Sequence, residues 1–449
     1  MLLFQREPQF DVALDKQIAE AADDFTRIAL KAKAAKDYFL LVGPPGTGKT
    51  SCALKKMVET FYKEEGAQIL LLSYTNRAVD EICKALSSIR PEVDFIRVGS
   101  ELSCDENYRD HLIENELATC MRRTEVCERI NRCRILVGTV ASISGKPELF
   151  RLKHFDVAIV DEATQILEPQ LLGILCAKGE NGKEGVGKFI LIGDHKQLPA
   201  VVLQNSEQSE VYDEALSAVG LKNLKDSLFE RLYRTARQHT DAHRTYDMLC
   251  RQGRMHPEVA LFANQAFYEG RLLPVGLPHQ LEDSGNINRL SFYPSQPEPM
   301  GSSAKTNHSE AKIAARLAAT VYKEHSEAFD ASRTLGIITP YRSQIALVKK
   351  EIEALGIPEL NQILIDTVER FQGSERDVII YSFCVNYPYQ LKFLSNLTEE
   401  DGILIDRKLN VALTRARKQM LLTGVPTLLE RNPLYKSLLK LIESLRNIA

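Results

Sequence analysis

The sequence predicts an α/β fold in two domains, each a parallel sheet flanked by helices. Three observations support this prediction. The chain has 449 residues, enough for two or three domains that each bury a core. Short apolar runs alternate with longer amphipathic segments, as in crossover units of parallel sheets. A second set of such runs occupies the C-terminal half, which indicates a second domain of the same class.

The first set contains five apolar runs that read as strands buried on both faces. They are "YFLLV" (38–42), "QILLLSY" (68–74), "RILVGT" (134–139), "FDVAIVDEA" (155–163) and "KFILIGD" (188–194). Helical patterns such as "NRAVDEICKALSSI" (76–89) lie between them. The segment 99–134 is charged and helical and carries no strand signal. We therefore predict that it is a helical insertion in the first domain.

The second set reads "TLGIITPY" (334–341), "ILIDTVERFQG" (363–373), "DVIIYSFC" (377–384) and "QMLLTGV" (419–425). Residues 276–309 are rich in Pro, Ser, Gly and Asn and predict a mobile loop with little regular structure. These patterns place the first domain at residues 1–240 and the second at residues 241–449.

Composition and charge narrow the class of protein. No apolar run is long enough to cross a bilayer, and the N-terminal residues turn acidic and polar too early for a signal peptide. Nine scattered cysteines, without CxxC pairs or regular ligand spacing, favour reduced thiols over a metal or iron–sulfur site. We expect a cytoplasmic or nuclear protein without membrane contact. The net charge of −3 gives no support for nucleic-acid binding, so such a partner would need a local groove.

The stretch "GPPGTGKT" (43–50), between a strand and a helical pattern, predicts a phosphate-binding loop. Its glycines let backbone N–H groups turn toward phosphates, Lys49 is expected to reach the β- and γ-phosphates, and the Thr50 hydroxyl to ligate Mg²⁺. The predicted nucleotide contacts of this loop are Gly43, Pro44, Pro45, Gly46, Thr47, Gly48, Lys49, Thr50 and Ser51.

Two later strand ends supply candidate catalytic groups. In "VAIVDEAT", Asp161 is expected to hold Mg²⁺ through water, and Glu162 to polarise the attacking water as general base. The alternative is that this acidic pair caps a helix. In "LIGDHKQLP", Gln197 can sense the γ-phosphate, although the stretch alone reads equally well as a loop.

Seven motifs in order extend this pattern over most of the chain. They are "GPPGTGKT", "DEATQ", "GDHKQLPAVV", "RMHPEVALFANQAFYEGRL", "GIITPYRSQ", "DTVERFQGSERDVII" and "LNVALTRAR", with "SLFERL" (227–232) before the fourth. They resemble the motifs of superfamily 1B helicases, in the group of the nonsense-mediated-decay RNA helicase and the replication nuclease-helicase. The resemblance covers about Gln17 to Thr427, and the helicase part of the latter is the more similar.

The resemblance implies two RecA-like domains that bind ATP and Mg²⁺ and, across their tops, single-stranded nucleic acid. By matching position, Gln17 would read the adenine edge and Glu375 would touch the ribose. Arg254 and Arg415 would be arginine fingers, because a fixed guanidinium from a second domain makes hydrolysis depend on closure. A solvated helix face is the alternative for Arg415.

Nucleic-acid contacts follow from the same resemblance. Short hydroxyl and amide side chains suit phosphate and sugar contacts that ignore base sequence. The matching positions are Ser73, Thr75, Asn76, Thr139, Pro340, Tyr341 and Thr367. Each of these residues taken alone is more often a helix cap or a turn residue, so only the set as a whole indicates nucleic-acid contact. The basic run "RRTEVCERINRCR" (122–134) is either a further contact or a solvated helix.

Two departures from the family pattern matter. Relatives commonly carry an aromatic before the "RMHP" arginine, and this chain has Gly253, which puts base stacking and the preference for ATP in doubt. Fewer than twenty residues precede Gln17, so we expect no counterpart in this sequence of the β-barrel, zinc-rich and nuclease domains of relatives. We expect either a minimal motor or one piece of a longer polypeptide, with a nuclease or regulatory domain supplied elsewhere.

These observations predict an ATP- and Mg²⁺-dependent translocase on single-stranded nucleic acid, with DNA favoured over RNA. The 5′ to 3′ direction is implied by the resemblance alone. Two alternatives stay open: an RNA or ribonucleoprotein remodeller, and an ATP-gated binding module that does not unwind. Strand displacement separates the module from the motor.

Overall fold

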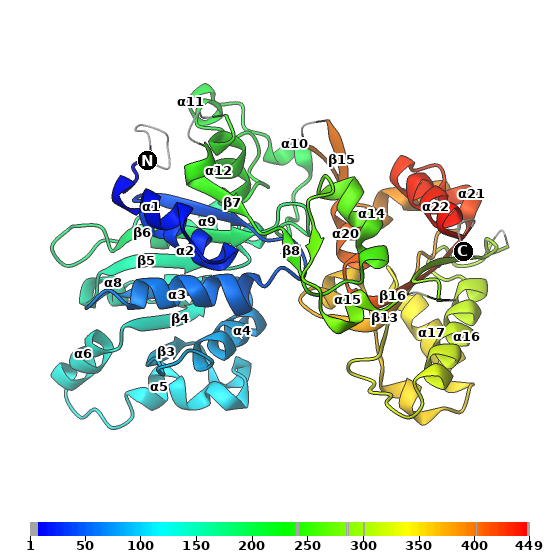
Figure 1. The fold of residues 1–449 in the computed structure, drawn as a ribbon, viewed down its shortest axis with the longest axis horizontal. Helices are drawn as coiled ribbons and strands as arrows, with labels where there is room; N and C mark the ends of the chain where they lie inside the picture. Colours follow the sequence, from blue (N-terminus) through cyan, green and yellow to red (C-terminus); the bar gives the residue numbers. More distant parts are fainter. Residues whose placement is uncertain are drawn as a thin grey trace. The chain divides into compact units, whose positions relative to one another are not determined.

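The computed structural model describes residues 8–238, 242–283, 285, 287–299, 301–400 and 402–446. Their contacts divide the chain into two compact units, drawn in Figure 1. The first unit ends at Leu249 and the second begins at Cys250. Residues 45–47 and 196–198 group with the second unit.

The first unit is built on a seven-stranded sheet in the order β3-β4-β2-β5-β6-β1-β7, in which all the neighbouring strands pair in parallel. The strands are β1 Tyr38–Val42, β2 Ile69–Ser73, β3 Phe95–Val98, β4 Ile135–Thr139, β5 Phe155–Val160, β6 Val186–Gly193 and β7 Tyr246–Met248. This order places the carboxyl ends of β1, β6, β5 and β2 side by side at one edge, where ligands of parallel sheets bind.

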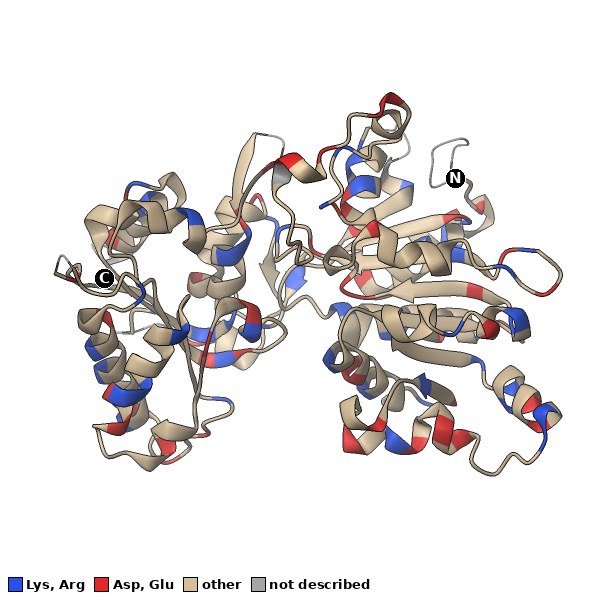
Figure 2. Cartoon of the chain, turned by 180° about the vertical axis from the view of Figure 1, so that it is seen from behind, with Lys and Arg blue, Asp and Glu red and all other residues tan. Residues whose placement is uncertain are grey.

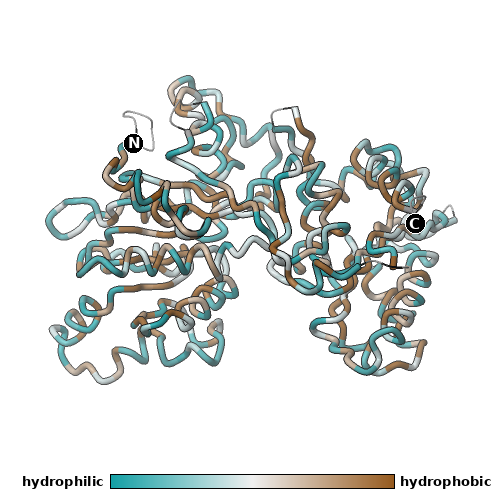
Figure 3. Tube along the Cα trace, in the orientation of Figure 1, coloured by the Kyte–Doolittle hydropathy of each residue, from teal (hydrophilic) through white to brown (hydrophobic). Residues whose placement is uncertain are grey.

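Helices cover both faces of this sheet, because alternate side chains of each strand point to opposite sides. Along β1, Phe39 and Leu41 belong to the apolar core on one face of the sheet, whereas Tyr38, Leu40 and Val42 belong to the core on the other face. The hydrophobic segments in Figure 3 follow these strands.

The helices of the first unit vary from one turn to more than three turns. They are α1 Asp15–Ala19, α2 Asp24–Ala34, α3 Lys55–Tyr62, α4 Asn76–Ser87, α5 Ile113–Glu116, α6 Arg123–Arg132, α7 Val140–Ser144, α8 Glu148–Leu152, α9 Glu168–Leu175, α10 Ser206–Ser209, α11 Glu214–Ala218, α12 Leu228–Ala236 and α13 Ala242–Thr245. Residues 99–134 contain α5, α6 and two 3₁₀ turns, Glu101–Ser103 and Glu106–His111, so this segment is helical as predicted.

Strand β3 was missed at the sequence level because a charged residue interrupts its apolar pattern. Arg97 is fully buried within the strand and pairs with Asp80 of α4. A buried guanidinium that is paired in this way can occupy a strand interior, although its residue type argues against one.

The second unit contains a five-stranded parallel sheet in the order β10-β16-β13-β11-β12. Its strands are β10 Leu290–Pro294, β11 Leu335–Ile338, β12 Leu364–Asp366, β13 Arg376–Ser382 and β16 Ala416–Gly424. Two small sheets accompany it: β8 Arg251–Gln252 with β9 Leu273–Pro274, and the antiparallel hairpin β14 Leu397–Glu400 with β15 Ile403–Asp406.

The helices of the second unit flank its sheet, and α16 and α17 pack with β11 and β13 in one apolar core. They are α14 Pro257–Phe267, α15 Pro278–Leu281, α16 His308–Glu324, α17 Arg342–Glu353, α18 Val368–Phe371, α19 Leu391–Leu394, α20 Arg407–Leu413, α21 Pro426–Leu429 and α22 Pro433–Arg446, with 3₁₀ turns at Pro358–Gln362 and Pro388–Gln390.

Two predictions in this half are wrong. Residues 276–309 contain α15 and β10 instead of a loop with little regular structure, since pairing with β16 supplies the hydrogen bonds that the composition does not reveal. Residues 284, 286 and 300 of this segment lie outside the described residues. The predicted strand 363–373 is β12 followed by α18, because Thr367 starts a helix after three strand residues.

Surface and thiol chemistry are consistent with the composition. Basic and acidic residues are interspersed along both units in Figure 2. All nine cysteines are described and none forms a disulfide bond. Within the described part of the chain, no helix combines the length and apolar character that a membrane span requires.

Candidate nucleotide site and nucleic-acid interface

The predicted phosphate loop leaves the carboxyl end of β1 and enters a π-helical turn, Lys49–Leu54, which continues into α3. Gly48 has a left-handed backbone, with φ of +76°, immediately before this turn. That conformation suits glycine, and it lets the chain reverse from strand to helix with its N–H groups at the helix start.

Gly43 allows the loop to close tightly over its own lysine. A Cβ at this position would lie 2.1 Å from Cγ of Lys49. The Lys49 ammonium donates to the Gly43 carbonyl oxygen at 2.5 Å. The loop is therefore a cradle that any side chain at Gly43 would fill.

Thr50 and Asp161 are joined directly, although 111 positions separate them. The Thr50 hydroxyl donates to Asp161 Oδ2 at 2.5 Å, and the Glu162 N–H donates to Asp161 Oδ1 at 2.9 Å. Asp161 follows β5 and is buried, and burial raises the pKa of its carboxyl group. Hydroxyl and carboxylate oxygens are the donors that Mg²⁺ prefers, so the donor set fits this ion.

Glu162 occupies a strained position beside Asp161. Its backbone is left-handed, with φ of +53°, a conformation that costs a non-glycine residue about 1–2 kcal/mol. Burial, reinforced by the charge of Asp161, raises the pKa of Glu162 to about 7 against the opposing effect of Lys49 and Arg77. A carboxyl with a pKa near 7 can both accept and release a proton at neutral pH.

Four predicted residues lie together in the second unit. Arg254 Nε donates to Glu375 Oε2 at 2.5 Å, and Arg415 Nη2 donates to Gln197 Oε1 at 3.5 Å. Burial opposes ionisation of Glu375, but Arg254, with help from Arg417, outweighs it and holds the pKa of Glu375 below its usual value. Arg415 is buried, which does not match the alternative of a solvated helix face.

The remaining predicted nucleotide contacts have varied surroundings. Gln17 is exposed on α1, and Ser51 is exposed in the π-helical turn. A Cβ at Gly253 would come within 3.2 Å of Leu277 Cδ1. Leu277 and Val275 are exposed apolar side chains beside the position where relatives carry an aromatic.

The predicted nucleic-acid contacts of the first unit cluster where β2 and β4 end. The hydroxyls of Thr75 and Thr139 cap α4 and α7 by accepting from Ala78 N and Ser142 N. Asn76 begins α4. Ser73 is fully buried, and its hydroxyl donates to the Asp161 carbonyl oxygen at 3.2 Å.

In the second unit, Pro340 and Tyr341 follow β11, and Thr367 follows the neighbouring β12, so all three lie at the carboxyl edge of the sheet. The Tyr341 hydroxyl lies 3.3 Å from Gln390 Nε2. Gln390 belongs to a segment, 386–393, in which no site is predicted from the sequence. Its signal, aromatic residues interleaved with lysine in "NYPYQLKF" (386–393), was available.

The basic run 122–134 is partly committed to internal contacts. Arg129 forms ion pairs with Asp94 and Glu116 at 3.0 and 2.7 Å, and Arg134 donates to backbone carbonyls of residues 62, 64 and 67. Arg122, Arg123 and Arg132 are exposed. Two of its five arginines therefore stabilise the first unit.

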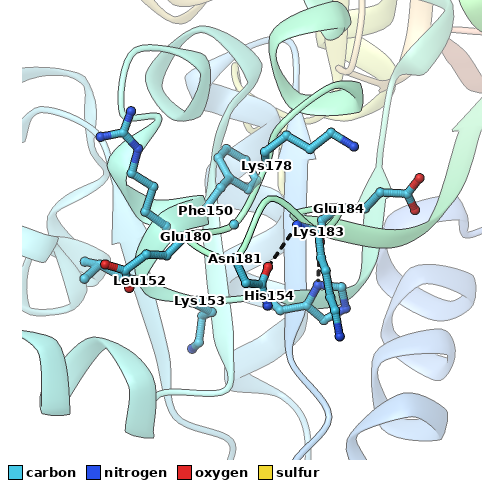
Figure 4. A pocket seen from close by; sticks show the side chains of 11 residues that line it. Phe150, Leu152, Lys153, His154, Lys178, Glu180, Asn181, Lys183 and Glu184 are labelled. Atoms are coloured by element: carbon cyan, nitrogen blue, oxygen red, sulfur yellow. Dashed lines mark hydrogen bonds between the residues drawn. The ribbon is translucent and has the colours of Figure 1, made fainter.

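A pocket of about 880 Å³ opens at the amino ends of β5 and β6, the opposite edge of the sheet from the phosphate loop. In Figure 4 the labelled Lys178, Lys183 and Glu184 extend outward in different directions. The pocket is lined by Phe150, Arg151, Leu152, Lys153, His154, Lys178, Gly179, Glu180, Asn181, Lys183 and Glu184. These charged side chains do not converge on one point of the pocket.

Comparison with known proteins places the chain among its relatives. Two family models described as AAA domain match it, one over residues 224–427 and the other over residues 20–126 and 113–205. The chain is 28% identical to the DNA replication ATP-dependent helicase/nuclease DNA2 of Bos taurus, over 98% of this chain and 41% of that protein. The Gallus gallus protein of the same name is 30% identical, with coverages of 90% and 36%.

A third relative is the DNA polymerase alpha-associated DNA helicase A of Saccharomyces cerevisiae, 26% identical over 91% of this chain and 65% of that protein. The chain thus spans about two fifths of the Bos taurus relative. The matched models and these relatives cover both units and the strand ends that carry the phosphate loop, Asp161 and Glu162. The AAA domain models and these relatives match the superfamily 1B helicase group that the sequence motifs resemble.

Proposed function

We propose that this protein is an ATP- and Mg²⁺-dependent motor that moves 5′ to 3′ along single-stranded DNA. Residues 1–240 would bind and hydrolyse the nucleotide, and residues 241–449 would supply the arginines that complete the site. The names of the relatives, which are DNA helicases, support DNA over RNA.

The observation that carries the proposal is the contact between Thr50 and Asp161 at the carboxyl edge of the first sheet. A helix-start hydroxyl and a strand-end carboxylate within 2.5 Å form one compact oxygen donor pair. Bound Mg²⁺ would neutralise charge on the transferring phosphoryl group. Thr50 would hold this ion through its hydroxyl and Asp161 would hold it through water, in place of the present hydrogen bond between them.

The other residues of the site divide the remaining work. Lys49 would turn from the Gly43 carbonyl to the β- and γ-phosphates, and Glu162 would take a proton from the attacking water. Arg254 and Arg415 would stabilise charge on the leaving group, and Gln197 would report the γ-phosphate. Arg254 would have to exchange its bond with Glu375 for the phosphate, which makes the ion pair a resting position of the arginine.

The proposal is tested by steady-state ATP hydrolysis with Mg²⁺, measured alone and with single-stranded DNA or RNA of equal length and simple sequence. Strong stimulation by DNA alone is expected. Equal or greater stimulation by RNA would move the assignment to an RNA remodeller. Hydrolysis that neither strand stimulates would refute the coupling to nucleic acid.

Strand displacement then tests movement. A labelled strand annealed beside a 5′ overhang should be released in an ATP-dependent manner, and the same duplex with a 3′ overhang should be released much less. Stimulated hydrolysis without displacement on either duplex would identify a nucleotide-gated binding module instead of a motor.

A further inference from the structure

The segment that follows β13 presents aromatic side chains beside a predicted nucleic-acid contact. Strands β11 and β13 are parallel neighbours, so Tyr341, after β11, and residues 383–397, after β13, emerge at the same edge of the sheet. Ligands of parallel sheets bind at this edge. The Tyr341 hydroxyl lies 3.3 Å from Gln390 Nε2, which joins the two segments directly.

Three aromatic residues of this segment are called here the aromatic platform: Tyr387, Tyr389 and Phe393. The rings of Tyr387 and Tyr389 are nearly parallel, with 14° between their planes and 5.8 Å between centroids. Tyr389 is 54% exposed and Phe393 is 64% exposed. Exposed apolar side chains that gather in one place can mark an interaction surface, and these rings gather within one short segment.

Buried amides hold the platform in place. Gln390 is 2% exposed, and its Oε1 accepts from the backbone N–H groups of Asn386 and Tyr387 at 2.8 and 2.9 Å. Its Nε2 donates to the Ala304 carbonyl at 2.6 Å. The backbone that carries Tyr387 and Tyr389 is therefore fixed before any ligand arrives, which lowers the entropy cost of binding.

Basic residues accompany the rings. Lys392 lies between the platform positions, Arg342 follows Tyr341, and the Lys305 carbonyl accepts from the Ser343 hydroxyl at 2.9 Å; all three basic residues are exposed. Nearby Glu369 is paired with Lys408 at 3.1 Å, which reduces its repulsion of an anion. Rings with interspersed cations are the arrangement that binds single strands without reading their sequence.

We propose that the aromatic platform stacks on the bases of single-stranded DNA, while Lys392 and Arg342 contact its phosphates. The inference rests on the proposed function and adds to it a base-contacting surface that the phosphate-directed residues Thr75, Thr139 and Thr367 do not supply. Stacking on π-faces tolerates every base, so it suits a motor that must accept any sequence.

The chain contains no tryptophan, which makes Tyr389→Trp a single fluorescent reporter on the full-length protein. Titration with an oligo(dT) strand should quench its emission as thymine stacks on the indole. An abasic strand of the same length and phosphate number should quench it much less. Equal quenching by both strands, or quenching by neither, would overturn the assignment.

Affinity provides the second readout. Because base–aromatic stacking contributes about 1–3 kcal/mol per base, Tyr389→Ala with Phe393→Ala should weaken oligo(dT) binding roughly tenfold or more. Binding of the abasic strand should change little. Leu355→Ala is the matched control, since Leu355 is an exposed apolar residue beyond the far end of α17. Thermal melting checks that each variant is folded.

The outcomes separate this inference from the proposed function. One outcome is that oligo(dT) stimulates ATP hydrolysis by the unmodified protein and that the double variant binds oligo(dT) equally well. This outcome would support the proposed motor function and refute the role of the aromatic platform. If the double variant loses both strands equally, the rings do not act through bases, and the inference is overturned. If the unmodified protein neither binds nor responds to DNA, the proposed function fails and the platform fails with it.

Discussion

Each unit of this protein contains a glutamate whose pKa is raised to about 7, the half-buried Glu162 in the first unit and the fully buried Glu310 in the second. Burial is the main cause in both. The charge of Asp161 adds to the effect at Glu162, and Lys49 and Arg77 oppose it. At Glu310, hydrogen bonds from neutral groups provide all the opposing effect.

The two sites also share a left-handed backbone next to the carboxylate. At Glu162 the strained residue is the glutamate itself, with φ of 53°. At Glu310 it is Cys384, with φ of 50°, whose N–H donates to Glu310 Oε2 at 2.8 Å. The Ser382 hydroxyl donates to the same oxygen at 2.7 Å.

The difference lies in what surrounds each group. Glu162 stands at the carboxyl edge of a parallel sheet beside a lysine and a second carboxylate. Glu310 is 0% exposed, and its partners Ser382 and Cys384 are themselves buried. A raised pKa alone therefore does not distinguish the proposed catalytic carboxyl group from a structural one, whereas the neighbouring charges and the solvent access of the two groups differ.

The largest expected difference between the two glutamates is in the rate of ATP hydrolysis when each is replaced by glutamine. Glu162→Gln should preserve ATP binding and lower kcat by roughly 10²–10⁴-fold, since the amide cannot accept the proton from water. Glu310→Gln keeps a carbonyl acceptor for the same hydrogen bonds and should leave kcat unchanged. ATP hydrolysis and binding of a fluorescent ATP analogue would be measured for both. An active Glu162→Gln protein would refute the assigned role.

The second test concerns the hydroxyl partners of the two regions. Thr50→Ala removes a proposed Mg²⁺ ligand and should raise the Mg²⁺ concentration needed for half-maximal hydrolysis roughly 10–100-fold. Ser382→Ala removes the hydroxyl that donates to Glu310 and should leave the Mg²⁺ dependence unchanged. Hydrolysis measured across a Mg²⁺ series checks both. Equal Mg²⁺ curves for Thr50→Ala and the unmodified protein would exclude Thr50 as a ligand.

The sequence alone was sufficient to predict the strands and motifs that short local patterns encode. Uninterrupted apolar runs marked β1, β2, β4, β5 and β6, because strands buried on both faces need apolar residues at every position. The phosphate loop and the acidic pair after β5 follow from spacing alone. The roles assigned to the individual site residues stay predictions.

The parts that were missed depend on contacts distant in the chain. The Glu310 site combines residues 295, 310, 382 and 384, none of which forms a periodic pattern with the others. Strand β10 is defined by its pairing with β16 more than by its own residues. Arg97 shows the same limit, since only its pairing with Asp80 makes a buried arginine acceptable in β3.

The third test is the pH dependence of stability in the second unit. Glu310 has a higher pKa in the folded state, about 7, than the ordinary value of 4.5 in the unfolded chain. The folded state thus retains a proton that the unfolded state releases, and stability falls as pH rises from 4.5 to 7. The loss is on the order of 3 kcal/mol, and Glu310→Gln should remove it.

Hydrogen exchange of α16 and β13 amides in the full-length protein would follow this effect without assuming that both units unfold together. The unmodified protein should lose protection between pH 5 and pH 7.5, and Glu310→Gln should lose much less. Parallel loss in both proteins would mean that Glu310 is ionised throughout this range.

The smallest expected effect is that of Ser382→Ala on stability. The Ser382 hydroxyl donates to a neutral carboxyl at low pH and to a carboxylate at high pH. Hydrogen bonds to charged groups contribute about 1.5–3 kcal/mol, and neutral ones about 0.5–1.5 kcal/mol. The cost of Ser382→Ala should therefore grow as pH rises through 7.

Without this donor the pKa of Glu310 should also rise, so stability should continue to fall above the pH where the unmodified protein levels off. Exchange protection of α16 amides at pH 5.5 and pH 8 measures the difference. If Ser382→Ala costs the same stability at pH 5.5 and at pH 8, the Ser382 hydroxyl does not stabilise the charged form of Glu310. The hydroxyl contact of Glu310 would then differ in its effect from the contact that Thr50 makes with Asp161.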